Sequence, residues 1–88
     1  MEQVANEAEF FTRVAFFDYL EPEERIEILE KRLSHVRDRL DYLSKLQQMA
    51  DEASATAHAQ RVLAFHGQQI RNEYQWIASW LEEMRASE

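Results

Sequence analysis

Three histidines are the side chains in this sequence that could bind a metal ion. His35, His58 and His66 have no histidine or acidic residue four positions later, and no glutamate three positions earlier. Helical bundles hold di-iron centres through a glutamate followed three residues later by a histidine, and metal ions need several such ligands together. The spacing therefore predicts that the chain has no metal site and no cofactor.

Catalytic groups are also unsupported by the sequence. The chain has no cysteine and only one glycine, so it offers neither a thiolate nucleophile nor a glycine-rich loop for a phosphate. Nucleophile and base pairs, and paired carboxylates in a formed cleft, are not recognisable either. We expect that the protein is not an enzyme.

Polar side chains interrupt an otherwise apolar helical face in the last third of the chain. His66 and Glu73 fall where that face requires apolar residues, with Gln69 between them, and polar groups there must be paired or hydrated. One interpretation is that the buried face drifts toward Gly67 and Tyr74 and leaves these groups at its margin. The other is a patch that binds an amphipathic effector, such as a small aromatic ligand, or fixes the register of a dimer. The candidate effector pocket then comprises Phe16, Phe17, His66, Tyr74, Trp76 and Trp80.

The elements that must position these groups are helices. The 88 residues include one glycine and one proline, and no alternating β-branched run of strand length occurs, so the fold class is all-α with one domain, residues 1–88. A chain this small leaves much apolar surface in water if it forms an isolated elongated hairpin. Association is the usual remedy, and we expect a coiled-coil-like homodimer.

The longest predicted helix covers residues 22–52. Proline suits the first turn of a helix, so the helix should begin at Pro22. Apolar residues then recur at alternating steps of three and four, which is the pattern of a coiled-coil seam. These seam residues are Ile26, Leu29, Leu33, Val36, Leu40 and Leu43. A second stripe recurs every seven residues and widens the buried arc, so the helix should contact at least two neighbours. Its members are Ile28, His35, Tyr42 and Met49.

Two further helices should surround this long helix. Residues 7–20 form a short aromatic helix, in which Phe10, Val14 and Phe17 make the clearest row. Its rings are either ordinary core or partly a wall that faces a ligand or another domain. Residues 57–85 form the last helix, joined through a turn at 51–56 as an antiparallel hairpin. It adds Leu63, Ile70, Ile77 and Trp80 to the hairpin and dimer core.

Gly67 lies inside the last predicted helix. A glycine there costs about 1 kcal/mol relative to alanine, so it should mark a close approach of two helices rather than a helix end, with a kink as the alternative.

The formal net charge of −7 predicts that this chain repels nucleic acid. Arg25, Arg32 and Arg39 nevertheless recur every seven residues and form one basic edge of the long helix. One interpretation is a solvated edge that pairs with acids of a neighbouring helix, such as Glu73, Glu82 or Glu83. The alternative is a stripe that follows a phosphate backbone, which the interleaved acidic residues argue against. We expect no direct DNA binding by this chain.

Targeting and membrane signals are not recognisable. The apolar run from Val14 to Phe17 ends at Asp18 and has no basic flank or cleavage site of a signal peptide. A membrane-spanning helix would need about 20 apolar residues. Together with the lack of cysteine, these features favour a cytoplasmic protein without membrane contact.

Residues 11–24 read FTRVAFFDYLEPEE and are followed by Ile28-Leu29 and Arg32-Leu33. This ordered set resembles the C-terminal helical domain of PadR-family transcriptional regulators, also called the virulence-activator alpha C-terminal domain. The family's last helix often carries a central glycine and then a tryptophan followed by an apolar residue and acids. Here that pattern fits at Trp76-Ile77 and again at Trp80-Leu81-Glu82-Glu83. The resemblance covers roughly residues 11–84.

The resemblance implies a dimerisation and regulatory domain. In such regulators an N-terminal winged helix binds DNA, and the C-terminal helices join two subunits so that both recognition helices meet a symmetric operator. Met1 stands only ten residues before Phe11, so we expect no winged helix within these 88 residues. The chain is then either a domain of a longer protein or a free-standing dimerisation partner. A small-molecule-binding helical module and a helical protein-protein adaptor unrelated to transcription remain open as alternatives.

Overall fold

A computed structural model describes residues 6–87 of the chain, and these residues form helices without a strand. In chain order the elements are α2 (Glu7–Ala15), the 3₁₀ turn η1 (Phe17–Tyr19), α3 (Pro22–Glu52) and α4 (Ala57–Ala86). The expected all-α class, with a short aromatic helix and a long helical hairpin, is confirmed. The first helix is shorter than predicted, because the α-helix ends at Ala15 and the chain tightens into η1 instead of continuing to residue 20.

The helix beginnings follow local chemistry. The side chain of Asn6 caps α2 by accepting a hydrogen bond from the backbone N–H of Glu9 at 3.2 Å. At the start of α3 the backbone N–H of Glu21 donates to Oε1 of Glu24 at 3.3 Å, and Pro22 occupies the first turn. Helix α3 therefore begins at Pro22, as the sequence predicts.

The turn between the long helices uses a left-handed residue. Ser54 has a φ of 54°, and the backbone N–H of Ala55 donates to the carbonyl of Ala50 at 2.9 Å. This is the Schellman arrangement, in which glycine is the usual residue at the left-handed position. Thr56 then caps α4 by accepting from the backbone N–H of Ala59 at 3.2 Å. The predicted turn at 51–56 is therefore confirmed.

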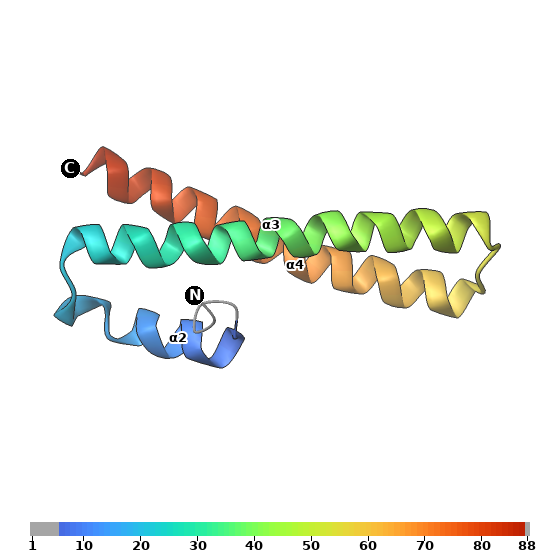
Figure 1. The fold of residues 1–88 in the computed structure, drawn as a ribbon, viewed down its shortest axis with the longest axis horizontal. Coiled ribbons are helices and arrows are strands. Elements are labelled where there is room, and N and C mark those ends of the chain that lie inside the picture. The colour runs from blue at the N-terminus through green and yellow to red at the C-terminus, as the bar shows by residue number, and fades with distance from the viewer. Residues whose placement is uncertain (1–5, 88) are drawn as a thin grey trace.

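The three helices form an elongated molecule of 49 × 24 × 17 Å. Figure 1 shows α3 and α4 side by side as an antiparallel hairpin, with α2 folded back along the half nearer the open end. The other half of the hairpin, residues 37–66, carries no third helix. We call residues 37–66 the distal arm.

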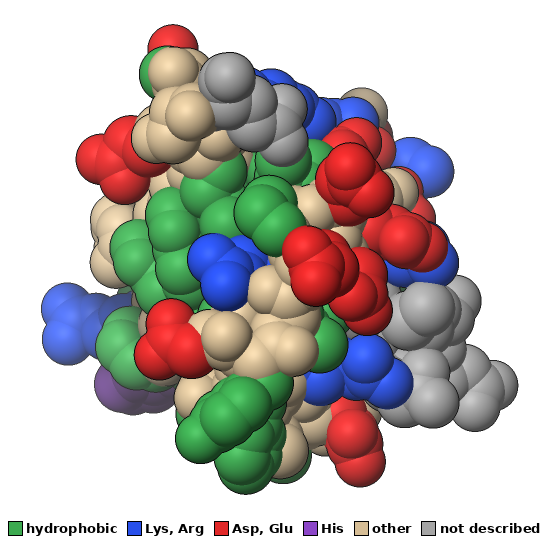
Figure 2. Space-filling model, turned by 90° about the vertical axis from the view of Figure 1, so that its left-hand side faces the viewer, with side chains coloured by type: hydrophobic (Ala, Val, Ile, Leu, Met, Phe, Trp, Pro, Cys, Tyr) green, Lys and Arg blue, Asp and Glu red, His purple; other side chains and the backbone are tan. Residues whose placement is uncertain are grey.

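The core lies where the three helices meet. Its buried apolar residues are Phe10, Phe17, Ile28, Leu29, Val36, Ile70, Ile77 and Leu81. An end view shows apolar side chains gathered in one band with acidic side chains on its flank (Figure 2). No residue of the distal arm is fully buried. Helix α2 therefore covers the apolar face of the hairpin near its open end. In the distal arm, α3 and α4 pack only against each other.

Gly67 marks the predicted close approach. A Cβ at this position would lie 3.3 Å from Cδ2 of Leu43 on α3, and α4 runs without interruption through the glycine. Gly67 therefore lies at a close approach of α3 and α4 and not at a helix end.

Candidate functional site

An ion pair joins α3 and α4 beneath α2. Nε of Arg32 lies 2.6 Å from Oε2 of Glu73, and Nη2 donates to Oε1 at 3.0 Å. The Arg32 side chain is 1% exposed, and its guanidinium lies 5.2 Å from the centre of the Phe10 ring. The predicted pairing with Glu73 is confirmed, but the expectation of a solvated edge is wrong here, because Phe10 of α2 closes over the arginine.

The other two arginines of that edge have separate environments. Nε of Arg25 donates to the carbonyl of Leu20 at 3.1 Å, which ties α3 to the chain entering it. Arg39 is exposed. Since Arg32 is buried between these two, the three arginines do not form a continuous surface that could follow a phosphate backbone.

Four aromatic rings form a row across three elements. The ring centres of Phe11 and Trp76 lie 6.3 Å apart, those of Trp76 and Trp80 5.5 Å, and those of Trp80 and Phe17 5.4 Å. Trp76 and Trp80 are one turn apart on α4, so their rings share one side of the helix. Phe17 is buried, whereas Phe11 and Trp76 are 44% and 45% exposed. The row therefore runs from the core to the surface.

A shallow cleft lies beside the two tryptophans. Trp76, Ser79, Trp80 and Glu83 line it, and its volume is about 370 Å³. It combines two indole rings with one hydroxyl and one carboxylate. Such a lining suits a planar apolar group that carries a positive charge or a hydrogen-bond donor.

A second cleft lies between the beginning of α2 and the middle of the hairpin. Its volume is about 620 Å³, and its lining includes Glu7, Phe11, Arg39, His66 and Trp76. Trp76 therefore borders both clefts. The second cleft is the more polar of the two, since acidic, basic and imidazole side chains meet in it.

The six residues of the predicted effector pocket occupy several places. Phe17, Trp76 and Trp80 belong to the aromatic row, and His66 shares only the second cleft with Trp76. Tyr74 faces α3, where the guanidinium of Arg37 lies 5.9 Å from its ring centre.

The remaining pocket residue, Phe16, is 56% exposed, and its ring lies 6.1 Å from that of Tyr19. The six side chains therefore do not line one common cavity.

His66 and Glu73, the polar residues on the apolar face of α4, lie at the margin of the core. Gly67 is buried and Tyr74 is half-buried, so the buried face does drift toward them, while His66 is exposed. Glu73 is accommodated by Arg32, which satisfies its carboxylate.

The ten residues predicted for the hairpin and dimer core are all at least partly buried. Leu29, Val36, Ile70 and Ile77 are fully buried. The partly buried ones are Ile26, Leu33, Leu40, Leu43, Leu63 and Trp80. The partly buried residues of the distal arm have only one neighbouring helix to cover them, which explains their incomplete burial.

The second stripe of α3 changes character along the helix. Ile28 is buried beneath the α2 layer, but Tyr42 and Met49 are 63% and 62% exposed. No signal in the sequence marks this difference, because all three occupy equivalent positions in a seven-residue repeat. The helix that covers Ile28 does not reach Tyr42.

His35 occupies the middle of that stripe and is electrostatically disfavoured as a cation. Its burial lowers the pKa of the imidazole, and the positive charges of Arg32 and Arg39 lower it further, against a smaller opposing influence of Glu73 and Asp38. The imidazole is therefore held neutral over a wider pH range than in an unfolded chain.

The described residues contain neither a cluster of metal ligands nor a membrane-spanning helix. Within residues 6–87, no three acidic or histidine side chains converge into a group that could hold a metal ion. None of the described helices is long and apolar enough to cross a membrane.

The comparisons with known proteins point to one family. The family model described as "Virulence activator alpha C-term" matches residues 8–87. No curated protein and no solved structure matches the chain. The matched range contains nearly all of the three-helix arrangement, including the ion pair and the aromatic row.

Proposed function

This chain belongs to the virulence activator alpha C-terminal family, and on that premise we propose that it is the dimerisation and regulatory domain of a PadR-like transcriptional regulator. DNA binding is supplied by a winged-helix domain elsewhere in the regulator, so this chain acts on DNA only through that domain. The proposal includes a cytoplasmic location and no enzymatic activity. Its role is to join two subunits at the spacing that a symmetric operator requires.

One observation carries the dimerisation proposal: the hairpin is covered by a third helix over only half of its length. The radius of gyration is 15.7 Å, whereas a compact domain of this length has about 12 Å. In the distal arm Tyr42, Met49, Val62 and Phe65 are each more than half exposed. Apolar patches of this kind mark association surfaces in soluble proteins.

Sedimentation equilibrium of the 88-residue chain over a wide concentration range tests this proposal. We expect a dimer at micromolar concentration. A folded monomer at every concentration would contradict dimerisation while leaving the fold intact. Circular dichroism of the same samples is the control, because it separates a folded monomer from an unfolded chain.

A second candidate function is the sensing of a small aromatic ligand, and the aromatic row supports it. Trp76 is almost half exposed at the point where two clefts meet, with Glu83 beside it in one of them. A planar cation could stack on the indole and be neutralised by the carboxylate. In a regulator, such a ligand would change the packing of α2 against α4 through Phe11.

Tryptophan emission measured with a panel of cationic dyes and aromatic acids tests the ligand proposal. A saturable change that is lost in Trp76→Leu and kept in Phe65→Leu would support it, because Phe65 is equally aromatic but lies outside the row. No response to any member of the panel would contradict it. A helical adaptor unrelated to transcription is excluded if a longer form of the protein contains an in-frame winged-helix pattern before these residues.

A further inference from the structure

The exposed apolar side chains of this molecule lie on one side of it. Among the described residues the large exposed ones are Phe11, Phe16, Tyr19, Tyr42, Met49, Val62, Phe65 and Trp76. Three of them belong to α2, η1 and the residue between them, and the others lie on the side of the hairpin against which α2 packs.

On α3, a groove continues from the beginning of α2 into the distal arm. Tyr42 lines a cleft of about 440 Å³ together with Arg39 and His66. Arg39 and His66 also line the neighbouring cleft, in which Glu7 and Phe11 of α2 take part. The Tyr42 cleft therefore adjoins the first turns of α2, on the same side of the hairpin.

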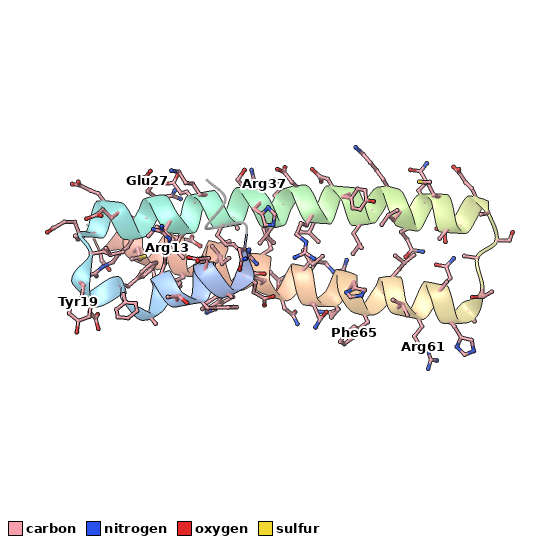
Figure 3. The ribbon with its side chains drawn as sticks, turned by 60° about the horizontal axis from the view of Figure 1, so that its bottom comes forward. Arg13, Tyr19, Glu27, Arg37, Arg61 and Phe65 are labelled. Carbon is pink, nitrogen blue, oxygen red and sulfur yellow. The ribbon has the colours of Figure 1, made fainter. Side chains whose placement is uncertain are left out.

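On α4, the seven-residue repeat places the exposed apolar residues on the side of the hairpin that carries α2. Val62 stands seven residues before Gln69, and Phe65 stands seven before Asn72. Gln69 and Asn72 line the cleft beside Glu7, so Val62 and Phe65 lie on the side that carries α2. Figure 3 shows Phe65 projecting outward from α4. We call the surface formed by Tyr42, Leu46 and Met49 of α3 and Val62, Phe65 and His66 of α4 the distal groove.

The outer surface of α2 carries small side chains, whereas the distal groove carries large ones. Its exposed residues include Ala8, Thr12 and Ala15, which recur on one helix face and are small. Phe11 and Phe16 flank this face and are 44% and 56% exposed. Large rings in the groove and small side chains on the helix allow close packing of the kind found between helices.

The two surfaces are complementary in length and charge. Helix α2 has nine residues and α3 has 31, so α2 with η1 covers less than half of the hairpin and leaves room for a second helix of equal length. The first turn of α2 carries Glu7 and Glu9. The end of the groove nearest to it carries Arg39, whose guanidinium attracts such acids, with Asp38 in the same cleft.

We propose that two copies of this chain pack antiparallel and face to face, each laying its α2 and η1 into the distal groove of the other. This geometry rests on the proposed dimerisation and specifies its surface. The two α2 helices then lie end to end between the two hairpins, with Glu7 of each copy near Arg39 of the other at the two-fold axis. The interface is isologous and closes on itself, so assembly stops at the dimer.

Serine substitutions in the groove test the surface. Tyr42→Ser combined with Phe65→Ser removes two exposed rings, so each subunit should keep its circular dichroism spectrum, while the dimer dissociation constant rises at least tenfold. The matched control is Gln48→Ser combined with Ala64→Ser, at residues that line the cleft on the other side of the hairpin. An unchanged dimer in the groove variant would overturn the proposed geometry.

Cross-linking between two variants tests the arrangement directly, since the chain has no cysteine of its own. Thr12→Cys subunits mixed with Val62→Cys subunits should give a cross-linked dimer with a short bismaleimide, and neither variant should do so alone. A dimer by sedimentation without this cross-link would overturn the geometry but leave the proposed function. A folded monomer would overturn both.

Discussion

The guanidinium of Arg32 and the carboxylate of Glu73 are joined by two contacts across the hairpin, under the ring of Phe10. Side chains from all three helices therefore contact one another at this point. The arginine is 1% exposed and the glutamate 17%, so the pair lies at the edge of the core with its positive member inside. This asymmetry governs the effect of removing either partner.

Removing the carboxylate of Glu73 should lower the free energy of unfolding more than removing the guanidinium of Arg32. Glu73→Ala takes the anionic partner from a buried cation, and we expect a loss of about 3 kcal/mol in the free energy of unfolding. Arg32→Met keeps the packing under Phe10 and leaves a carboxylate that water can reach, so its loss should be smaller. Urea unfolding measures both, with the exposed Glu82→Ala as control. An equal or larger loss in Arg32→Met would contradict this account of the pair.

Phe10 should hold α2 on the hairpin. Its ring is fully buried, and Phe10→Ala should lower the free energy of unfolding by about 3 to 5 kcal/mol through lost burial and a cavity. Phe16→Ala removes a ring that is 56% exposed and should change stability by less than 1 kcal/mol in the monomer. Thermal and urea unfolding at low protein concentration compare the two. Similar losses would mean that α2 is not anchored by Phe10.

At position 54 of the hairpin turn, where φ is positive, glycine should be more stable than serine. Ser54→Gly relieves the steric cost of a positive φ, partly offset by glycine's greater freedom in the unfolded chain, so stability should rise by about 0.5 to 1 kcal/mol. Ser54→Ala also removes the hydroxyl but keeps the Cβ, and should give no such gain. The midpoint of urea unfolding reports the difference. A gain in both variants would point to the hydroxyl instead.

Stability should depend on pH through His35. Because burial and the neighbouring arginines lower the pKa of the imidazole in the folded state, the unfolded chain binds a proton first as the pH falls. The folded state should therefore be fully favoured above the unfolded pKa of about 6.5 and lose stability as the pH falls below it, until the folded-state pKa is passed. His35→Gln should flatten this part of the stability profile.

Unfolding experiments between pH 5 and 8 give that profile, and His58→Gln is the control for replacing an exposed imidazole near the hairpin turn. Nuclear magnetic resonance of the His35 ring protons provides the folded-state pKa independently. A titration midpoint at or above 6.5 would contradict the assigned direction.

The sequence alone determined the two long helices, the turn between them and the presence of a short aromatic helix, but not where that short helix ends. Proline at position 22, the cap at Thr56 and the seven-residue rows are local signals, each set by residues within a few turns of one another. The same rows identified the residues that face the partner helix, and the arginine repeat predicted an edge that pairs with acids of a neighbouring helix, with Glu73 as one of three candidates. These features follow from backbone geometry, which neighbouring residues dictate.

The tertiary structure decided how far each row is buried. Ile28 and Tyr42 occupy equivalent places in one repeat, yet one is buried and the other is 63% exposed, because α2 covers only the open end of the hairpin. Arg32 is buried for the same reason, since Phe10 closes over it. The six residues of the predicted pocket were likewise separated by the position of α2 and by the face of α4 on which each stands. Burial depends on which distant segment packs against a residue, and a periodic pattern within one helix does not contain that information.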